Sequence, residues 1–364
     1  MKTREILIVF IVFFLSYSYT NAQEMDSACT MFDCCRPDGH APLGIMTDHI
    51  HGKGEWTISY SYMNMQMKGN QVGESKVSDS QVFSNYIMSS NTMSMQTHML
   101  MGMYGVSDRL TIMGMFSYML NSMTMNMTPS MTAMMNMPGM NMGNMSEQSM
   151  QDMQHSKTSG LGDTRIYGLY KIMDKKRQRI IAGLGINLPT GSIHENGTTL
   201  LGPEQRLPYM MQLGSGTYDL LPNITYVGQK AAISWGAYAG ANIKTMNNGE
   251  GYHWGNEYNA SAWIGYKFLP FASASVRVEG IYTDAIMGYD PHIVILMNND
   301  PNSNTNNYGG EKMNVYLGLN LYKYKSELKG ARLQIEYGMP FYQNLNGPQM
   351  SAKSTVMAGV QYIF

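Results

Sequence analysis

The chain reads LTIMGMFSY at residues 110–118, a stretch in which apolar side chains alternate with small, hydroxyl-bearing or sulfur-bearing ones. Ile112 and Phe116 fall on one face of an extended strand, whereas Met113 and Met115 fall on the other, because successive side chains of a strand point to opposite sides. The stretch therefore predicts a strand with one apolar face and one face of small, hydroxyl-bearing or sulfur-bearing side chains.

About twelve segments of roughly ten residues repeat this alternation between Glu55 and the C-terminus. Short connections are expected near residues 105–108, 174–176, 228–230, 269–271 and 325–327, and long ones near residues 68–92, 121–160, 193–215, 245–252, 286–308 and 344–352. A ring of such strands leaves no unpaired edge in lipid. The predicted fold of residues 55–364 is all-β: a closed antiparallel transmembrane β-barrel of about twelve strands with long extracellular loops.

The composition agrees with a barrel that has one lipid-facing side. Charged residues make up 14% of the chain, against roughly 25% in soluble domains. The net charge of −1 leaves no basic surface for nucleic acid. His98 is the one histidine inside a predicted strand, and no serine stands out near it as the partner in a catalytic Ser-His pair. We therefore expect outer-membrane lipid as a partner, no nucleic acid, and no enzymatic activity.

The two ends of the chain predict export and membrane insertion. Lys2 and Arg4 precede a short apolar run, and Ala22 offers a cleavage point, so residues 1–22 are expected to be a signal peptide. The final segment places an aromatic residue at Tyr362 and another at Phe364, which resembles the last strand of outer-membrane barrels. We expect the barrel-assembly machinery to bind this strand, and the location to be the outer membrane of a Gram-negative bacterium.

Methionine is the anomaly of the composition, with 38 residues in the chain. The predicted extracellular loop at 121–160 is low in complexity and dense in methionine. Thioether sulfur is a soft, uncharged donor that favours Cu(I) or Ag(I). Methionine also fills irregular space and consumes oxidants, which is the alternative interpretation. The candidate metal ligands of this loop are Met123, Met125, Met127, Met134, Met135, Met137, Met140, Met142 and Met145.

The predicted strands add methionines and charges to the second face. Met63, Met65 and Met67 share one face, expected to be the lumen, whereas the face of the methionines at 93–103 cannot be assigned from the alternation. Charges such as Arg277 are expected in the lumen, where they either set pore selectivity or pair across a packed interior. Glu279, Arg332 and Glu336 belong to the same set.

A second candidate cluster lies in residues 23–54, which are expected to form a periplasmic N-terminal segment. Cys34 and Cys35 carry thiols, and His49 and His51 form an alternating pair suited to chelation by an extended chain. Such ligands suit copper or zinc. The alternative is an ordered plug whose histidines only form hydrogen bonds.

Two motifs resemble a known family. The stretches GLGINLPTG (183–191) and MQLGSGTYD (211–219) are similar to the barrels grouped under the MetA pathway of phenol degradation. APLGIMTDH (41–49) resembles a methionine-rich subset of that family. The resemblance implies an outer-membrane transporter without catalytic residues; the family name implies small aromatic solutes, and the subset implies copper or silver.

Together these features predict a channel-like transporter that handles soft metal ions through its methionine-rich loops, with Cu(I) or Ag(I) as the bound or transported ion. Two alternatives stay open. One is an uptake channel for small aromatic or hydrophobic compounds, and the other is a surface barrel that binds metal without transport.

Overall fold

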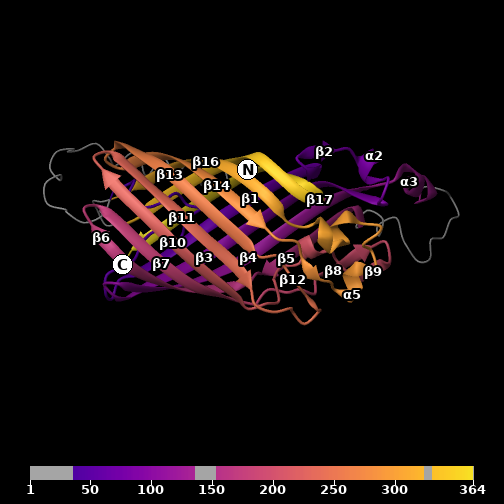
Figure 1. Cartoon of the computed structure of the whole chain (residues 1–364), viewed down its shortest axis with the longest axis horizontal. Coiled ribbons are helices and arrows are strands. Elements are labelled where there is room, and N and C mark those ends of the chain that lie inside the picture. Colours follow the sequence, from indigo (N-terminus) through magenta and orange to yellow (C-terminus); the bar gives the residue numbers. More distant parts are fainter. Residues whose placement is uncertain (1–35, 136–152, 324–329, 364) are drawn as a thin grey trace, which may run out of the picture. The chain divides into compact units, whose positions relative to one another are not determined.

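The computed structural model describes residues 36–135, 153–323 and 330–363. Within them, eleven strand elements form a closed antiparallel ring, in which the last element pairs with the first (Figure 1). The ring consists, in order, of β1 (Trp56–Gly73), β3 (Met88–Ser107), β4 (Leu110–Met127), β6 (Thr164–Lys175), β7 (Gln178–Leu188), β10 (Asp219–Lys230), β11 (Ile233–Lys244), β13 (Glu257–Leu269), β14 (Ala272–Thr283), β16 (Gly310–Tyr322) and β17 (Arg332–Ile363). Two short strands, β2 (Ser75–Val77) and β5 (His155–Leu161), pair with β1 and β4 outside the ring.

The element β17 supplies two passes of the barrel. Its first arm pairs with β16 from Arg332 to Leu345, and its second arm pairs with β1 from Leu345 to Ile363. The arms run in opposite directions, and the amide of Ala352 donates to the side chain of Gln343 across them (2.9 Å). With the two arms of β17 counted separately, the described ring has about twelve strands, which confirms the predicted fold class.

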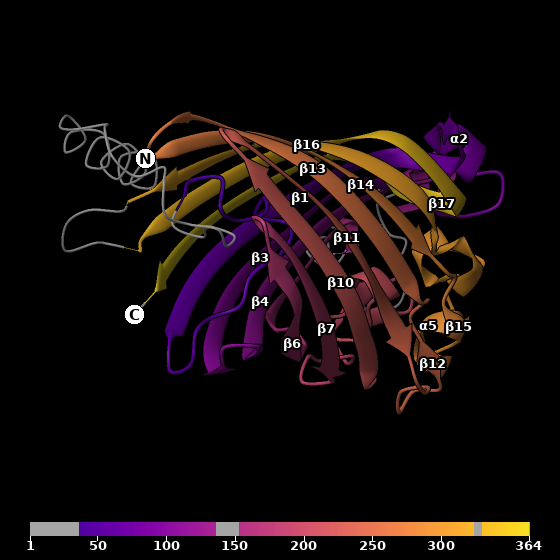
Figure 2. The same ribbon diagram turned by 60° about the vertical axis from the view of Figure 1, so that its left-hand side comes forward.

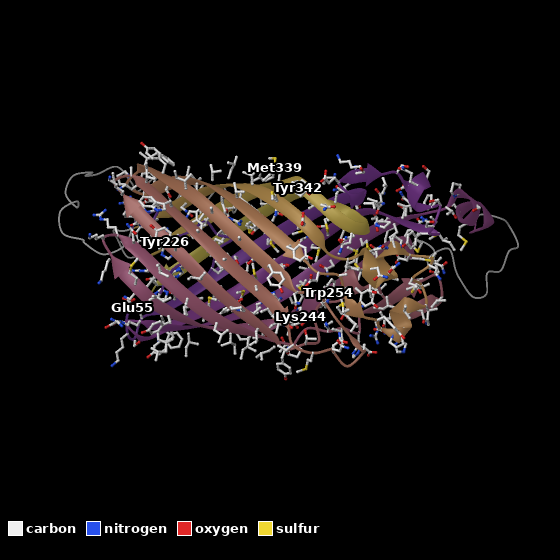
Figure 3. The ribbon with its side chains drawn as sticks, viewed as in Figure 1. Glu55, Tyr226, Lys244, Trp254, Met339 and Tyr342 are labelled. Atoms are coloured by element: carbon white, nitrogen blue, oxygen red, sulfur yellow. The ribbon has the colours of Figure 1, made fainter. Side chains whose placement is uncertain are left out.

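The apolar positions of the alternation point outward and form a continuous belt. Phe116 is 57% exposed and Leu184 61% exposed, whereas Met113, on the opposite face of the same strand as Phe116, is 0% exposed. Figure 3 shows the outward side chains along the strands, with Met339 among them. Exposed apolar area on this scale marks a surface that another apolar phase covers, which for a barrel is lipid. None of the described helices is long and apolar enough to cross a membrane.

The two ends of the barrel differ as predicted from loop lengths. At one end, β6 and β7 are joined by two residues, Lys176 and Arg177, whose positive φ angles of 52° and 58° are those of a type I′ turn. At the other end, the connections contain helices and short strands. These are α2 (Asp79–Val82), α3 (Pro129–Met135), β8 (Asn196–Thr199), β9 (Gly202–Arg206), η1 (Tyr209–Met211), β12 (Tyr252–His253), β15 (Met287–Gly288), α5 (Pro291–Val294), η2 (Pro301–Ser303) and η3 (Thr305–Asn307). We call these connections the cap.

The predicted loop at 121–160 is shorter than expected, which corrects one boundary. Strand β4 continues through Met127, and β5 already begins at His155. The period of two persists, because buried Met123 and Met125 still alternate with half-buried Thr124. The outward side chains become polar there, as in Thr124, since this part of the strand extends past the apolar belt.

Residues 36–51, the lumenal segment, lie inside the ring (Figure 2). The segment contacts strands on several sides: Thr47 hydrogen-bonds Thr225 of β10 (3.2 Å), and the amide of His51 donates to Thr111 of β4 (2.9 Å). On a third side, Arg332 of β17 donates to the carbonyl of Pro37 (2.9 Å). Every described residue of the segment is buried or half-buried. Arg36 donates to the carbonyl of Ala231, in the short connection between β10 and β11 (2.6 Å), so the segment occupies the lumen on the side of the short turns.

Candidate functional site

Methionine is the most frequent residue on the inward face of three adjacent strands. Met65 of β1 pairs with Met95 of β3, and Met101 and Met103 of β3 pair with Met115 and Met113 of β4. We call this set the methionine ladder. It consists of Met63, Met65 and Met67 of β1, Met93, Met95, Met99, Met101 and Met103 of β3, and Met113, Met115, Met119, Met123, Met125 and Met127 of β4.

The structure settles which face the methionines of β3 occupy. Met93 and Met103 are each 1% exposed and line the interior. His98, on the opposite face, lies outside and hydrogen-bonds the phenol of Tyr60 (2.7 Å). The sequence left this face unassigned because the outward side of β3 carries polar residues such as Gln96, so neither side looked like a lipid face.

The cap end of the ladder is a buried cluster in which nine of ten residues are methionine. Met123, Met125 and Met127 belong to it, next to Met67 and Met93. These three predicted ligands are therefore brought together with methionines of the neighbouring strands. Met134 and Met135 lie in α3. Cys34, Cys35, Met137, Met140, Met142 and Met145 lie outside the described residues.

Below this cluster the lumen contains a cavity of about 540 Å³, the methionine chamber. Nine methionines line it: Met63, Met65, Met67, Met95, Met99, Met115, Met119, Met210 and Met350. Trp254 and Tyr308 line it from the cap. Four charged side chains, Asp163, Arg165, Glu257 and Lys312, also reach the cavity. The chamber thus combines a soft, apolar wall with a few polar groups.

The cap is held over the chamber by buried aromatic rings and ion pairs. Tyr209 stacks edge-on against Tyr252 and Tyr308, with ring centroids 4.9 and 5.8 Å apart. Arg206 pairs with Asp290 (2.9 Å). Burial raises the pKa of Tyr209 to about 12, so its hydroxyl stays protonated at physiological pH. These contacts make the cap an ordered lid over the outer end of the ladder.

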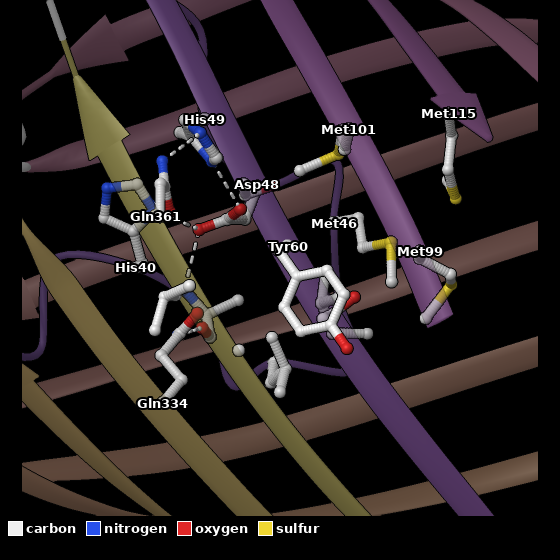
Figure 4. Close-up of a pocket in the computed structure, with 17 residues that line it drawn as sticks. His40, Met46, Asp48, His49, Tyr60, Met99, Met101, Met115, Gln334 and Gln361 are labelled. Carbon is white, nitrogen blue, oxygen red and sulfur yellow. Dashed lines mark hydrogen bonds and ion pairs between the residues drawn. The ribbon is translucent and has the colours of Figure 1, made fainter. Parts of the chain in front are cut away.

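The floor of the chamber is the lumenal segment. Met99 and Met115 line the chamber and also a second pocket of about 30 Å³, which contains Met46, Met101, His40, Asp48 and His49 (Figure 4). The ladder therefore connects the chamber with His40, Asp48 and His49 of the lumenal segment, which we call the polar cluster. A space of this size holds one water-sized species.

In the polar cluster, the Asp48 carboxylate lies between two imidazoles. His49 Nδ1 is 2.7 Å from Asp48 Oδ1, and His40 Nδ1 is 3.6 Å from Asp48 Oδ2. The predicted partner His51 is instead hydrogen-bonded to the hydroxyl of Thr57 (2.9 Å). Burial lowers the pKa of His40 well below its usual value and that of His51 to about 3, so both rings are neutral. The structure therefore groups His49 with His40 and Asp48, two residues that the sequence did not single out.

The lumenal charges pair with one another and with the segment. Arg277 is 1% exposed; its Nε donates to Glu336 (3.1 Å) and its guanidinium to Glu279 (2.9 Å). The ring of Tyr316 lies under the same guanidinium, 3.8 Å away. These contacts correspond to one of the two predicted roles of the lumenal charges, which is to pair with one another across a packed interior.

Comparisons with known proteins agree with this architecture. No curated protein matches the sequence. An outer membrane channel, COG4313 from Pseudomonas putida F1, has a TM-score of 0.55 and 13% identity over 86% of this chain and 97% of its own. A Pseudomonas aeruginosa FadL homologue (TM-score 0.39, 11% identity, 85% and 89% coverage) and the CymD monoaromatic hydrocarbon channel (0.38, 8%, 86% and 88%) are more distant. The first of these similarities shows a shared fold.

The barrel, its apolar belt and this fold place the protein in the Gram-negative outer membrane as a channel-like barrel. The family model matches residues 110–293, which run from β4 through α5. The chain belongs to the family described as "Putative MetA-pathway of phenol degradation".

Proposed function

We propose that this protein is an outer-membrane channel for soft monovalent metal ions, Cu(I) or Ag(I), which move along the methionine ladder. The observation that carries the proposal is the register of β1, β3 and β4. A rung is a set of directly paired inward residues, one each from β1, β3 and β4. The six successive rungs from Thr57 to Met67 each contain at least one thioether.

The spacing of the rungs suits ion transfer from site to site. Successive inward positions lie about 6.8 Å apart along a strand, and directly paired side chains begin about 5 Å apart. Methionine has three flexible bonds, so neighbouring sulfurs can share one ion. Thioethers are neutral and bind more weakly than thiolates, and a conducting site must also release its ion.

The distribution of methionine argues against a general bias of the chain. The outward face of the same three strands uses other apolar residues, such as Ile58, Leu100 and Phe116. At the described outward positions of β1 from 56 to 68, of β3 from 92 to 104 and of β4 from 110 to 126, there is no methionine. On these three strands the thioether is thus confined to the side that faces the lumen.

The narrowing below the chamber favours an ion over an aromatic solute. The chamber itself is large enough for a small aromatic molecule, since ligand pockets range from about 300 to 1,000 Å³. The pocket beneath it measures about 30 Å³, whereas a cavity that holds benzene is about 150 Å³. The pocket beside Met101 therefore has room for a bare ion and not for an aromatic ring.

Substitution of methionine by leucine tests the proposal, because leucine keeps the apolar volume and removes the sulfur. The ladder variant replaces Met65, Met95, Met99 and Met119. The surface control replaces four exposed methionines, Met246, Met287, Met313 and Met339. We expect cells that produce the ladder variant to accumulate about 10-fold less silver than cells with the surface control, with equal uptake of a small aromatic compound.

Each alternative predicts a different outcome. An aromatic-uptake channel predicts equal silver accumulation in the two variants. A barrel that binds metal without transport predicts that silver stays at the cell surface, where a membrane-impermeant chelator removes it. Either result would contradict the proposed passage of soft ions.

A further inference from the structure

The geometry points to a metal-binding site in the lumenal segment, formed by His40, Asp48 and His49, which takes one copper or zinc ion. The three ligands of this site supply nitrogen and oxygen donors, unlike the sulfur donors of the ladder, of which Met101 borders the same pocket. It does not depend on whether the channel transports metal.

The three donors already lie close to one another. One nitrogen from each histidine and one carboxylate oxygen of Asp48 all lie within 4.8 Å of one another. Bonds of about 2.1 Å put tetrahedral donors about 3.4 Å apart, so closure requires shifts of roughly 1 Å. Imidazole and carboxylate form the common protein ligand sets for zinc, and imidazole also suits copper.

One donor has no partner within the described residues. His40 is 6% exposed, and its Nε2 is buried without a hydrogen bond. A buried polar nitrogen without a partner destabilises the fold, and a bound ion would supply the missing partner. The adjacent pocket of about 30 Å³ gives room for a single ion beside the ring.

The surrounding groups orient the donors. The amide of Ala41 donates to Asp48 Oδ2 (2.7 Å), which fixes the carboxylate between the rings. The side-chain amide of Gln361, from β17, lies 3.3 Å from His49 Nε2. Such partners hold ligand histidines in one tautomer and one orientation. Figure 4 shows Asp48 and His49 turned toward each other, with Gln361 beside them.

The thioethers of Met46 and Met101 line the same pocket. They give copper a fourth donor that zinc does not favour. A second group of potential ligands, Glu250, Asp290 and His292, lies in the cap, where Arg206 already pairs with both carboxylates (3.7 and 2.9 Å). The cluster in the lumenal segment is therefore the stronger candidate.

The test measures binding of Cu(II) alone to the purified full-length barrel in detergent, with Cys29, Cys34 and Cys35 replaced by serine so that thiols do not compete. We expect one tightly held ion whose electron paramagnetic resonance spectrum shows coupling to two imidazole nitrogens. His40→Gln and His49→Gln should each weaken binding by more than about 100-fold, and Gln361→Ala by about 10-fold.

His51→Gln is the matched control, because His51 is also a buried imidazole of the segment but bonds to Thr57. It should keep the affinity and the two-nitrogen signal. Heat-modifiable migration in gels shows whether each variant is folded. Equal affinity in the folded His40→Gln variant, or loss of the ion only in His51→Gln, would overturn the assignment. Because the experiment involves no transport, it can fail while the proposed function stands.

Discussion

The backbone amide of Gly44, in the lumenal segment, donates a 2.7 Å hydrogen bond to Oε2 of Glu336 in the barrel wall. Glu336 also accepts from Arg277, which is buried on β14. The segment is therefore attached to the wall by a hydrogen bond to a charged acceptor inside a buried ion-pair network, the stronger class of protein hydrogen bond.

Replacing Glu336 with Gln should loosen this attachment. The carboxylate charge disappears, and hydrogen bonds to charged groups contribute about 1.5–3 kcal/mol. We expect the amide of Gly44 to exchange with deuterium about 10- to 100-fold faster in the variant. Glu311→Gln, at an exposed position of β16, is the control that should leave this rate unchanged. Equal exchange in all three proteins would show that the carboxylate does not hold the segment.

A methyl group at Gly44 should displace the segment. A Cβ there would collide with the guanidinium of Arg277, which is already held by Glu336 and Glu279. Gly44→Ala is therefore expected to raise the single-channel conductance in planar bilayers. At Gly114 a Cβ meets nothing within 4 Å, so Gly114→Ala should conduct like the unaltered protein. A conductance that is the same in both variants contradicts a role for the segment as an obstruction.

Silver should protect the ladder from oxidation. An ion coordinated by a thioether occupies the lone pair that an oxidant attacks. We expect bound Ag(I) to slow sulfoxide formation at Met95 and Met119, which line the chamber, and to leave Met246 and Met287, which are exposed, unaffected. Peptide mass spectrometry after brief peroxide treatment measures both sets. Equal protection of the two sets would count against the ladder.

The cap should respond to pH through Asp300. Burial raises the pKa of this carboxyl from 3.8 to about 6, so the folded cap keeps the proton to a higher pH than the opened loop does. Stability against local opening is therefore greatest at low pH, falls as the pH rises from about 4 to about 6, and then levels off. Asp300→Asn should remove this dependence and stabilise the cap at pH 7 by up to about 3 kcal/mol.

Hydrogen exchange across η2 and η3 at several pH values checks this expectation. The Asn side chain still offers an oxygen to the amide of Asn302, which donates to Asp300 at 2.9 Å. An exchange profile of the unaltered protein that is flat from pH 4 to 7 would rule out titration of this group.

The barrel was predictable from the sequence because a period of two reports directly on a strand with two faces. Ile112 and Met113 are on opposite sides for that reason alone. The extent of β4 was not predictable. Around Met125 the outward residues are polar, so a strand beyond the lipid looks like a polar, low-complexity loop.

The polar cluster was only partly predictable. His49 stood out through its neighbour His51, but the structure joins it to His40 and Asp48 through an irregular turn. No periodicity links His40 with Asp48, and the turn depends on contacts with the wall, such as that of Gly44. Short-range spacing therefore singled out His49 and His51, whereas the grouping of His49 with His40 and Asp48 depends on the tertiary structure.

Silver entry into lipid vesicles tests the central claim most directly. Vesicles that contain the purified protein and an internal silver indicator are exposed to Ag(I) or to Na⁺ at equal concentration. If the methionine ladder conducts soft ions, Ag(I) enters at least about 10-fold faster than Na⁺, and the ladder variant loses this advantage while the surface control keeps it. Equal entry of the two ions, or undiminished Ag(I) entry in the ladder variant, would contradict the claim.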